Sequence, residues 1–241
     1  MEETETLDAL PDIQALLGLK APPIAIGFFD GPPAGVPLWK GPSAPSGCSF
    51  WLRAQQGESF CTAASDHYNC PVGAYTHGIS LPPERAGELM QTLQFMDANG
   101  YVSMDEVPGI PTLPQRPRYV AYAPADRAPF APAVVVVAAR PAQAMLLYEA
   151  ALQSGASGAL MNTSGRPACA ILPLAVKTGS AALSLGCKGN RVYTGLPDEE
   201  MYVSVPGTQW AAVAARLERI VAANAVIGGY HEGRRQEFRA I

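Results

Sequence analysis

The stretch AVVVVAARPAQAMLLYEAAL, residues 133–152, decides the fold class that we expect. Four consecutive valines leave its first part without a polar face, which is typical of a strand buried on both sides. Pro141 then stands where a helix can begin, and apolar residues recur behind it at helical spacing as far as Gly155. Because a helix launched directly from a buried strand is the usual unit of a parallel sheet, we predict an α/β or α+β fold. Its mixed, partly parallel sheet would be flanked by helices.

Further elements are predicted on both sides of this unit. Apolar runs bounded by proline and glycine predict strands at 24–29, 119–122 and 201–205. Helical spacing predicts three more helices. The first carries Leu7, Leu10, Ile13, Leu16 and Leu17; the second follows Pro83 and carries Leu89, Met90, Leu93 and Met96; the third follows Thr208 and carries Trp210, Val213, Leu217, Ile220 and Val221. We expect the two methionines to fill gaps in the core. With no internal repeat, residues 1–241 are predicted to form a single domain.

Composition narrows the partners and the compartment. The chain has 241 residues, of which 48% are apolar and 16% charged, and its net charge is −4. Without a run of basic residues, nucleic acid is not an expected partner. The acidic N-terminus does not match a secretory signal, and the longest apolar run, 131–139, falls short of the roughly 20 residues that span a bilayer. We therefore expect a cytoplasmic protein that does not enter the membrane.

The segment 47–78, GCSFWLRAQQGESFCTAASDHYNCPVGAYTHG, is rich in cysteine and histidine. It holds three of the five cysteines and two of the three histidines. Thiolates and imidazoles are the ligands that zinc, copper and iron–sulfur clusters prefer. An odd number of cysteines in a cytoplasmic protein favours thiols, metal ligands or catalysis over disulfides.

The residues leave several alternatives open. A local zinc site would use Cys61, His67, Cys70 and His77, although their gaps do not form the paired knuckles of structural zinc sites. A distributed site would gather Cys48, Cys70, Cys169 and Cys187 around an iron–sulfur cluster. The cysteines could equally be small apolar residues of the core.

The neighbours of two cysteines indicate chemistry. Glycines follow Cys70 and flank Cys187, and glycine lets backbone amides come close to sulfur. Lys188 and Arg191 favour the thiolate of Cys187, and a thiol enzyme using either cysteine, activated by these cations or by His67, is a further alternative. The residues considered for contacts around a metal or with a substrate are His67, Lys188, Arg191 and Tyr193.

The order of several motifs resembles a known family. The motifs are PIAI at 23–26, Cys48, HYNCPVGA at 67–74, VVVV at 134–137 with PAQAM at 141–145, AC at 168–169 and GCKGNR at 186–191. Together they resemble the domain of unknown function 169 family of bacteria and archaea, from the first strand to about residue 201. The resemblance implies cysteines at 48, 70, 169 and 187, and no counterpart for Cys61. Four such thiols match the ligand count of a [4Fe–4S] cluster, and also that of a zinc site.

These observations lead to one expectation and one alternative. We expect a cytosolic metal-binding protein in which Cys48, Cys70, Cys169 and Cys187 hold a [4Fe–4S] cluster for electron transfer or a reductive reaction. Its partner would be a small-molecule substrate or an electron-transfer protein. The alternative is a non-redox module that binds a small molecule, with the cysteines on structural zinc or in the core. The family implies no reaction, so the enzyme class and the oligomeric state stay open.

Overall fold

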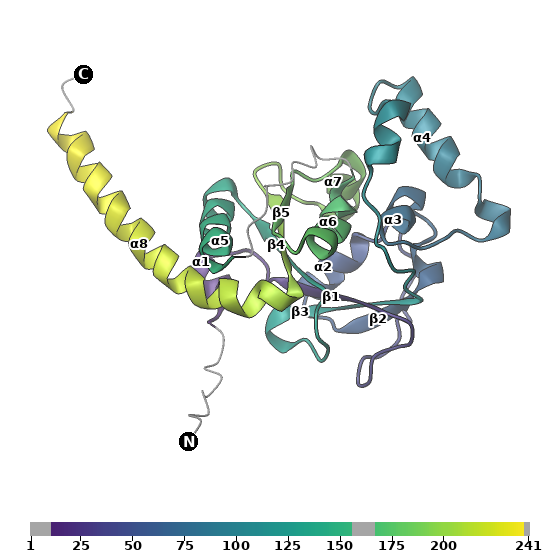
Figure 1. The fold of residues 1–241 in the computed structure, drawn as a ribbon, viewed down its shortest axis with the longest axis horizontal. Helices are drawn as coiled ribbons and strands as arrows, with labels where there is room; N and C mark the ends of the chain where they lie inside the picture. Colours follow the sequence, from purple (N-terminus) through teal and green to yellow (C-terminus); the bar gives the residue numbers. More distant parts are fainter. Residues whose placement is uncertain (1–10, 156–166, 239–241) are drawn as a thin grey trace.

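The computed structural model describes residues 11–155 and 167–238, which form one six-stranded sheet with helices on both faces (Figure 1). The order of the strands is β2-β3-β1-β4-β6-β5. The strands are β1 (Ile24–Phe29), β2 (Phe60–Ala63), β3 (Tyr119–Pro124), β4 (Val134–Ala139), β5 (Ala182–Ser184) and β6 (Met201–Pro206). The helices are α1 (Ile13–Leu17), α2 (Ser49–Gln55), α3 (Pro71–Thr76), α4 (Glu88–Ala98), α5 (Pro141–Ser154), α6 (Ile171–Thr178), α7 (Lys188–Thr194) and α8 (Trp210–Glu237). Short 3-10 helices are η1 (Ala64–His67), η2 (Pro83–Arg85), η3 (Met104–Gly109), η4 (Ala125–Arg127), η5 (Ala168–Ala170) and η6 (Gly207–Gln209).

The mixed class with flanking helices is confirmed, but the prediction of a partly parallel sheet is wrong. Every pair of neighbouring strands is antiparallel. The predicted helix does follow the valine strand, as α5 follows β4. However, the next strand in the chain, β5, does not lie beside β4, because β6 is inserted between them and runs antiparallel to both. The two strands therefore run in the same direction without pairing.

The valine strand is the centre of the core and serves both faces of the sheet. Val134 and Val136 belong to one apolar cluster, in which the sheet packs against α2 and α6. Val135 and Val137 belong to the other, in which it packs against α1, α5 and α8. Alternating side chains of a strand point to opposite faces, so a run of valines is required here.

The first helix ends where its sequence predicted. Gly18 takes a left-handed conformation with φ 61° and caps α1, as glycine commonly does at this position. The buried amide of Gln143 on α5 donates to the carbonyls of Leu17 and Gly18, at 2.9 Å each, and so fixes α1 against α5. Leu7 and Leu10 of the predicted helix lie outside the described residues.

Helix α4 forms where predicted, but its methionines do not fill the core. Leu93 is its buried residue, whereas Met90 is 46% exposed. Met96 lines a cavity described below. The reason is that α4 stands at the margin of the molecule, away from both faces of the sheet (Figure 1).

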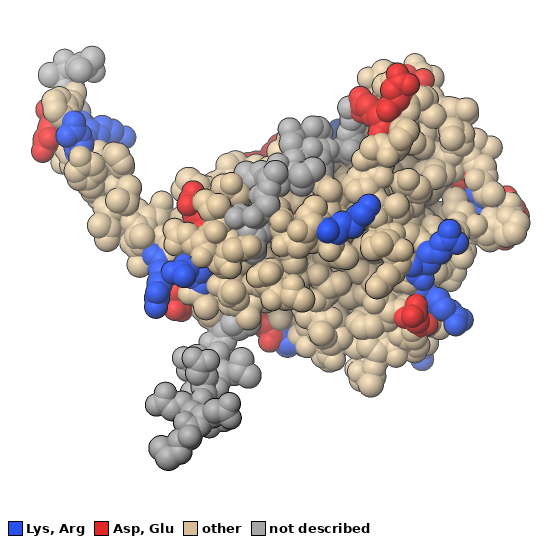
Figure 2. All heavy atoms as spheres, in the orientation of Figure 1, with Lys and Arg blue, Asp and Glu red and all other residues tan. Residues whose placement is uncertain are grey.

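The last helix, α8, is longer than its apolar face. Its first part packs on α5 and α1 through residues that include Trp210, Val213 and Leu217. Its second part stands clear of the body, with acidic and basic side chains gathered near its end (Figure 2). Among the described residues, no helix combines the length and apolar character needed to cross a bilayer.

Candidate functional site

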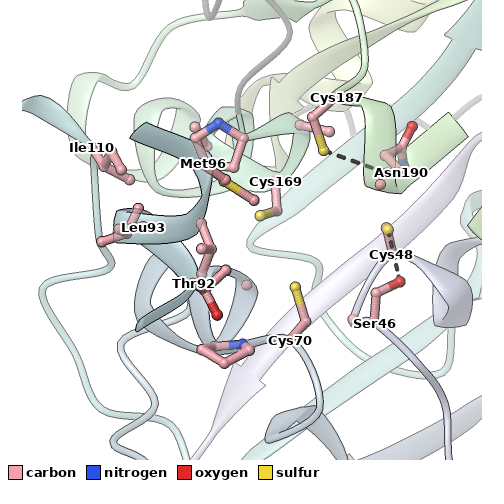
Figure 3. Close-up of a pocket in the computed structure, with 18 of the residues that line it drawn as sticks. Ser46, Cys48, Cys70, Thr92, Leu93, Met96, Ile110, Cys169, Cys187 and Asn190 are labelled. Atoms are coloured by element: carbon pink, nitrogen blue, oxygen red, sulfur yellow. Dashed lines mark hydrogen bonds between the residues drawn. The ribbon is translucent and has the colours of Figure 1, made fainter. Parts of the chain in front are cut away.

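A cavity of about 520 Å³ opens between the cysteine-bearing segments and α4. Four cysteines line it: Cys48, Cys70, Cys169 and Cys187. Their sulfur atoms face a common space in Figure 3. These are the residues predicted as metal ligands, so the fold brings together segments that are up to 139 positions apart in sequence. Their role as ligands stays a prediction.

Each cysteine stands at or just before the start of a helix. Cys48, Cys70 and Cys187 directly precede α2, α3 and α7, and Cys169 lies in η5, which leads into α6. Pro71 occupies the first turn of α3, where its missing N–H is not needed. The amides at the start of a helix favour a thiolate over a thiol. The same local design is thus repeated at four places around one cavity.

Polar groups lie within hydrogen-bond distance of three of the four sulfur atoms. The Ser46 hydroxyl lies 3.0 Å from Sγ of Cys48, and the backbone N–H of Asn190 donates to Sγ of Cys187 over 3.4 Å. The Thr76 hydroxyl lies 3.1 Å from Sγ of Cys169. The side chain of Cys70 makes no such bond at the start of α3; burial raises its pKa, and the nearby Gly73 backbone offsets part of that rise. A β-carbon at Gly73 would lie 3.0 Å from that sulfur, so the close approach needs glycine.

Without a cation, the buried thiols resist ionisation. Burial raises the pKa of Cys70 to about 11, raises that of Cys48, and raises that of Cys169 well above its usual value. Each of the three is raised further by Coulomb repulsion from others of the four, including Cys187. A positively charged group in the cavity would remove this repulsion and favour the thiolates.

Cys61 lies apart from this group. It is fully buried on β2 and packs in a small cluster with Val36 and Ala121. Burial, with a smaller effect of Asp66, raises its pKa to about 11. The local zinc set of Cys61, His67, Cys70 and His77 is not assembled. Over residues 11–155 and 167–238, no three cysteine, histidine or carboxylate side chains are placed to hold one metal ion.

Three of the four predicted contact residues, Lys188, Arg191 and His67, do not line the cavity. Arg191 donates to the backbone carbonyls of Leu185, Leu196, Pro197 and Glu200, at 2.6–3.3 Å. Its role in the structure is to hold the loops on either side of α7. Lys188 is exposed, and its backbone N–H donates to the Tyr101 hydroxyl. Tyr193 does line the cavity.

The histidines form a buried pair next to the cavity. His77 lines the cavity, and the ring of His67 packs against it at a tilt of 35°, with ring centroids 5.3 Å apart. Nδ1 of His77 donates to the Gly73 carbonyl over 2.7 Å, and Nε2 of His67 lies 2.9 Å from the Thr62 hydroxyl. Burial lowers the pKa of His77 to about 4 and that of His67 well below its usual value. Both rings are therefore neutral at pH 7.

Sequence reasoning missed the partners of the sulfur atoms. Asn190 stands three residues after Cys187, the spacing at which a capping side chain meets a backbone N–H, so this contact had a readable signal. Thr76 reaches Cys169 across 93 positions, which no local pattern predicts. Also missed was the apolar wall opposite the cysteines, formed by Leu93, Met96, Val102, Ile110 and Pro111.

Comparisons with known proteins agree with the resemblance seen in the motifs. The model of the DUF169 family, described as uncharacterised ArCR, matches residues 12–216. The uncharacterized protein MJ0308 of Methanocaldococcus jannaschii is 31% identical over 162 residues, which cover 65% of this chain and 69% of that protein. No solved structure matches. Since the family model spans most of the sequence, including all four cysteines of the cavity, the chain belongs to the DUF169 family.

Proposed function

We propose that the protein binds one [4Fe–4S] cluster through Cys48, Cys70, Cys169 and Cys187 and uses it for electron transfer or for a reductive reaction in the cytosol. One observation carries the proposal: four buried or half-buried thiols face one cavity, and polar groups lie within hydrogen-bond distance of the sulfur atoms of Cys48, Cys169 and Cys187. Hydrogen bonds to sulfur and restricted access to solvent are the means by which proteins set the potential of such clusters.

The arrangement favours a cluster over a single zinc ion. Four ligands of one zinc ion crowd around it, at about 2.3 Å for each Zn–S bond. No three candidate ligands within the described parts of the chain meet this requirement. A cubic cluster takes each thiolate on a different iron, so its ligands stand farther apart around a larger centre. The 520 Å³ cavity provides room for such a centre.

The residues fit the charge of the group. Thiolates are needed for binding, and a cluster's irons would offset the repulsion that raises the pKa of Cys48, Cys70 and Cys169. When bound, a [4Fe–4S] cluster accepts and releases one electron at a time. Ser46, Thr76 and the Asn190 amide would stabilise the added negative charge of the reduced form.

The test is purification without oxygen, followed by metal, sulfide and absorption measurements on the same sample. We expect about four irons and four sulfides per chain, with a broad band near roughly 400 nm. Replacing any one of Cys48, Cys70, Cys169 or Cys187 with serine should remove most of this iron, since each is a ligand.

Cys61→Ser is the matched control, because Cys61 is also a buried thiol but lies in a different cluster of side chains. It should keep the iron content of the original protein. Stoichiometric zinc, or an equal loss of iron on changing Cys61, would contradict the proposal.

A further inference from the structure

The cavity has two chemically different sides. Cys48 and Ser46 lie on one side in Figure 3, and Leu93, Met96 and Ile110 lie on the other. With Val102 and Pro111, these three apolar residues form a surface that we call the roof. The roof comes from α4 and the segment that follows it, whereas the cysteines come from segments packed on the sheet. None of the roof side chains has a group that could ligate iron in place of a cysteine, apart from the weak thioether of Met96.

The cavity is larger than a cluster requires. If each of the eight atoms of a [4Fe–4S] core takes a water molecule's share of about 30 Å³, the core fills roughly 240 Å³. That is less than half of the 520 Å³ available. The space left beneath the roof is enough for roughly nine further non-hydrogen atoms on the same scale.

The lining also restricts the charge of an occupant. Among the described lining residues there is no lysine and no arginine to neutralise an anion, whereas Glu106 contributes a carboxylate. His77, the one imidazole of the lining, is neutral because burial lowers its pKa to about 4. A bound cluster ligated by four thiolates would add negative charge. A phosphate or carboxylate in this space would therefore lose its hydration without gaining a cation.

We infer that the space between the roof and the cysteines is a binding site for a largely apolar molecule without negative charge, about the size of one substituted ring. The inference rests on the proposed function for the size of the ligand and on the lining residues for its charge. If the cluster serves a reductive reaction, such a molecule is the expected class of substrate, because a molecule held here lies next to the cysteines.

Three probes of nearly equal shape test the charge requirement: benzyl alcohol, benzoate and benzylamine, which is a cation at neutral pH. Their affinities for the full chain, purified without oxygen, are measured by ligand-observed NMR titration. We expect benzyl alcohol and benzylamine each to bind at least tenfold more tightly than benzoate. Binding of benzoate as tight as that of either would overturn the inference, as would the absence of benzyl alcohol binding.

Two tryptophan variants of α4 test the location. Met96→Trp should fill the space under the roof and weaken benzyl alcohol binding at least tenfold. Met90→Trp lies on the same helix but does not line the cavity and is 46% exposed, so it should change the affinity less than twofold. Undiminished binding to a folded Met96→Trp variant would place the ligand elsewhere.

Iron and sulfide are determined on every sample, which separates the two proposals. Selective binding of benzyl alcohol to an iron-free chain would leave the ligand site standing and refute the cluster. Full iron content, with benzoate bound as tightly as the other probes, would support the cluster and refute the ligand site.

Discussion

The hydroxyl of Thr76 lies 3.1 Å from Sγ of Cys169 and 2.8 Å from the carbonyl oxygen of Gly73. It has a single proton to donate, and a charged acceptor forms the stronger bond. When Cys169 is a thiolate, the proton is therefore expected on the sulfur side. The bond connects α3 directly to η5, two segments that both carry cysteines of the cavity.

Thr76→Val is expected to lower the reduction potential of a bound cluster. The change removes one hydrogen bond that stabilises the more negative, reduced form. A bond of about 1 kcal/mol corresponds to roughly 40 mV for one electron. Redox titration followed by electron paramagnetic resonance measures the shift. Thr178→Val is the control, because that hydroxyl donates to the Leu174 carbonyl at the exposed end of α6. An unchanged potential in the Thr76 variant would contradict a role for this bond.

Gly73→Ala is expected to separate stability from iron binding. Alanine is the better helix former, by up to about 1 kcal/mol, and Gly73 lies within α3. However, the new methyl group would stand 3.0 Å from Sγ of Cys70, so that the sulfur must shift. We expect lower iron content without a lower melting temperature of the metal-free chain. Gly87→Ala, where the nearest atom to a new β-carbon is 3.5 Å away, should keep its iron.

Acid should destabilise the protein through His77. Its pKa is about 4 in the folded chain, against 6.5 for an unperturbed histidine, because burial disfavours the charged ring. The unfolded chain thus takes up the proton first, and stability is lost as the pH falls from 6.5 through 4. The shift corresponds to roughly 3 kcal/mol. Urea denaturation at several pH values measures this effect. Between pH 7 and 4, the free energy of unfolding of His77→Phe should fall by roughly 3 kcal/mol less than that of the original protein.

His231→Gln is the control for this measurement, since His231 is exposed on α8. It should follow the pH dependence of the original protein. If the His77 variant followed the same curve as well, the acid sensitivity would have to come from other groups.

Arg191→Lys should weaken the protein although it keeps the charge. The guanidinium donates to four backbone carbonyls at once, and an ammonium group with three protons cannot reproduce that planar arrangement. We expect a loss of roughly 2–3 kcal/mol in the free energy of unfolding, with faster release of iron because Cys187 lies between the loops that Arg191 holds. Arg53→Lys, at a surface ion pair with Glu58, should change the unfolding free energy by less than about 0.5 kcal/mol. Equal effects of the two changes would refute the assigned role of Arg191.

The valine strand shows what the sequence could and could not predict. Its burial on both faces follows from Val134 to Val137, because no polar side chain interrupts the alternation. Its pairing does not follow, since the choice of neighbour depends on where β6 inserts, more than sixty residues later. A helix after a buried strand is a local property, whereas the order of strands is a property of the whole chain.

The candidate site, too, could be predicted from the sequence only in part. The four cysteines were identified through the family's motif order, and their convergence needed the fold. Arg191 was predicted near a substrate because of its charge beside Cys187, but the same charge binds backbone carbonyls instead. Met96 was predicted to fill the core but lines the cavity instead. Helical spacing predicts which residues share one face of a helix, but not what that face contacts.

The place of β6 in the sheet has a consequence for synthesis of the chain. In the part of the chain that the structure describes, β5 joins the sheet only through β6, which is the last strand to leave the ribosome. Cys169 and Cys187 stand on either side of β5 in sequence. Their segments also contact α3 and α2 directly, so what β6 adds, after residue 206 has emerged, is the backbone pairing that joins β5 to the sheet. A nascent chain that stops before β6 thus carries all four cysteines but lacks the strand that pairs β5 with the rest of the sheet.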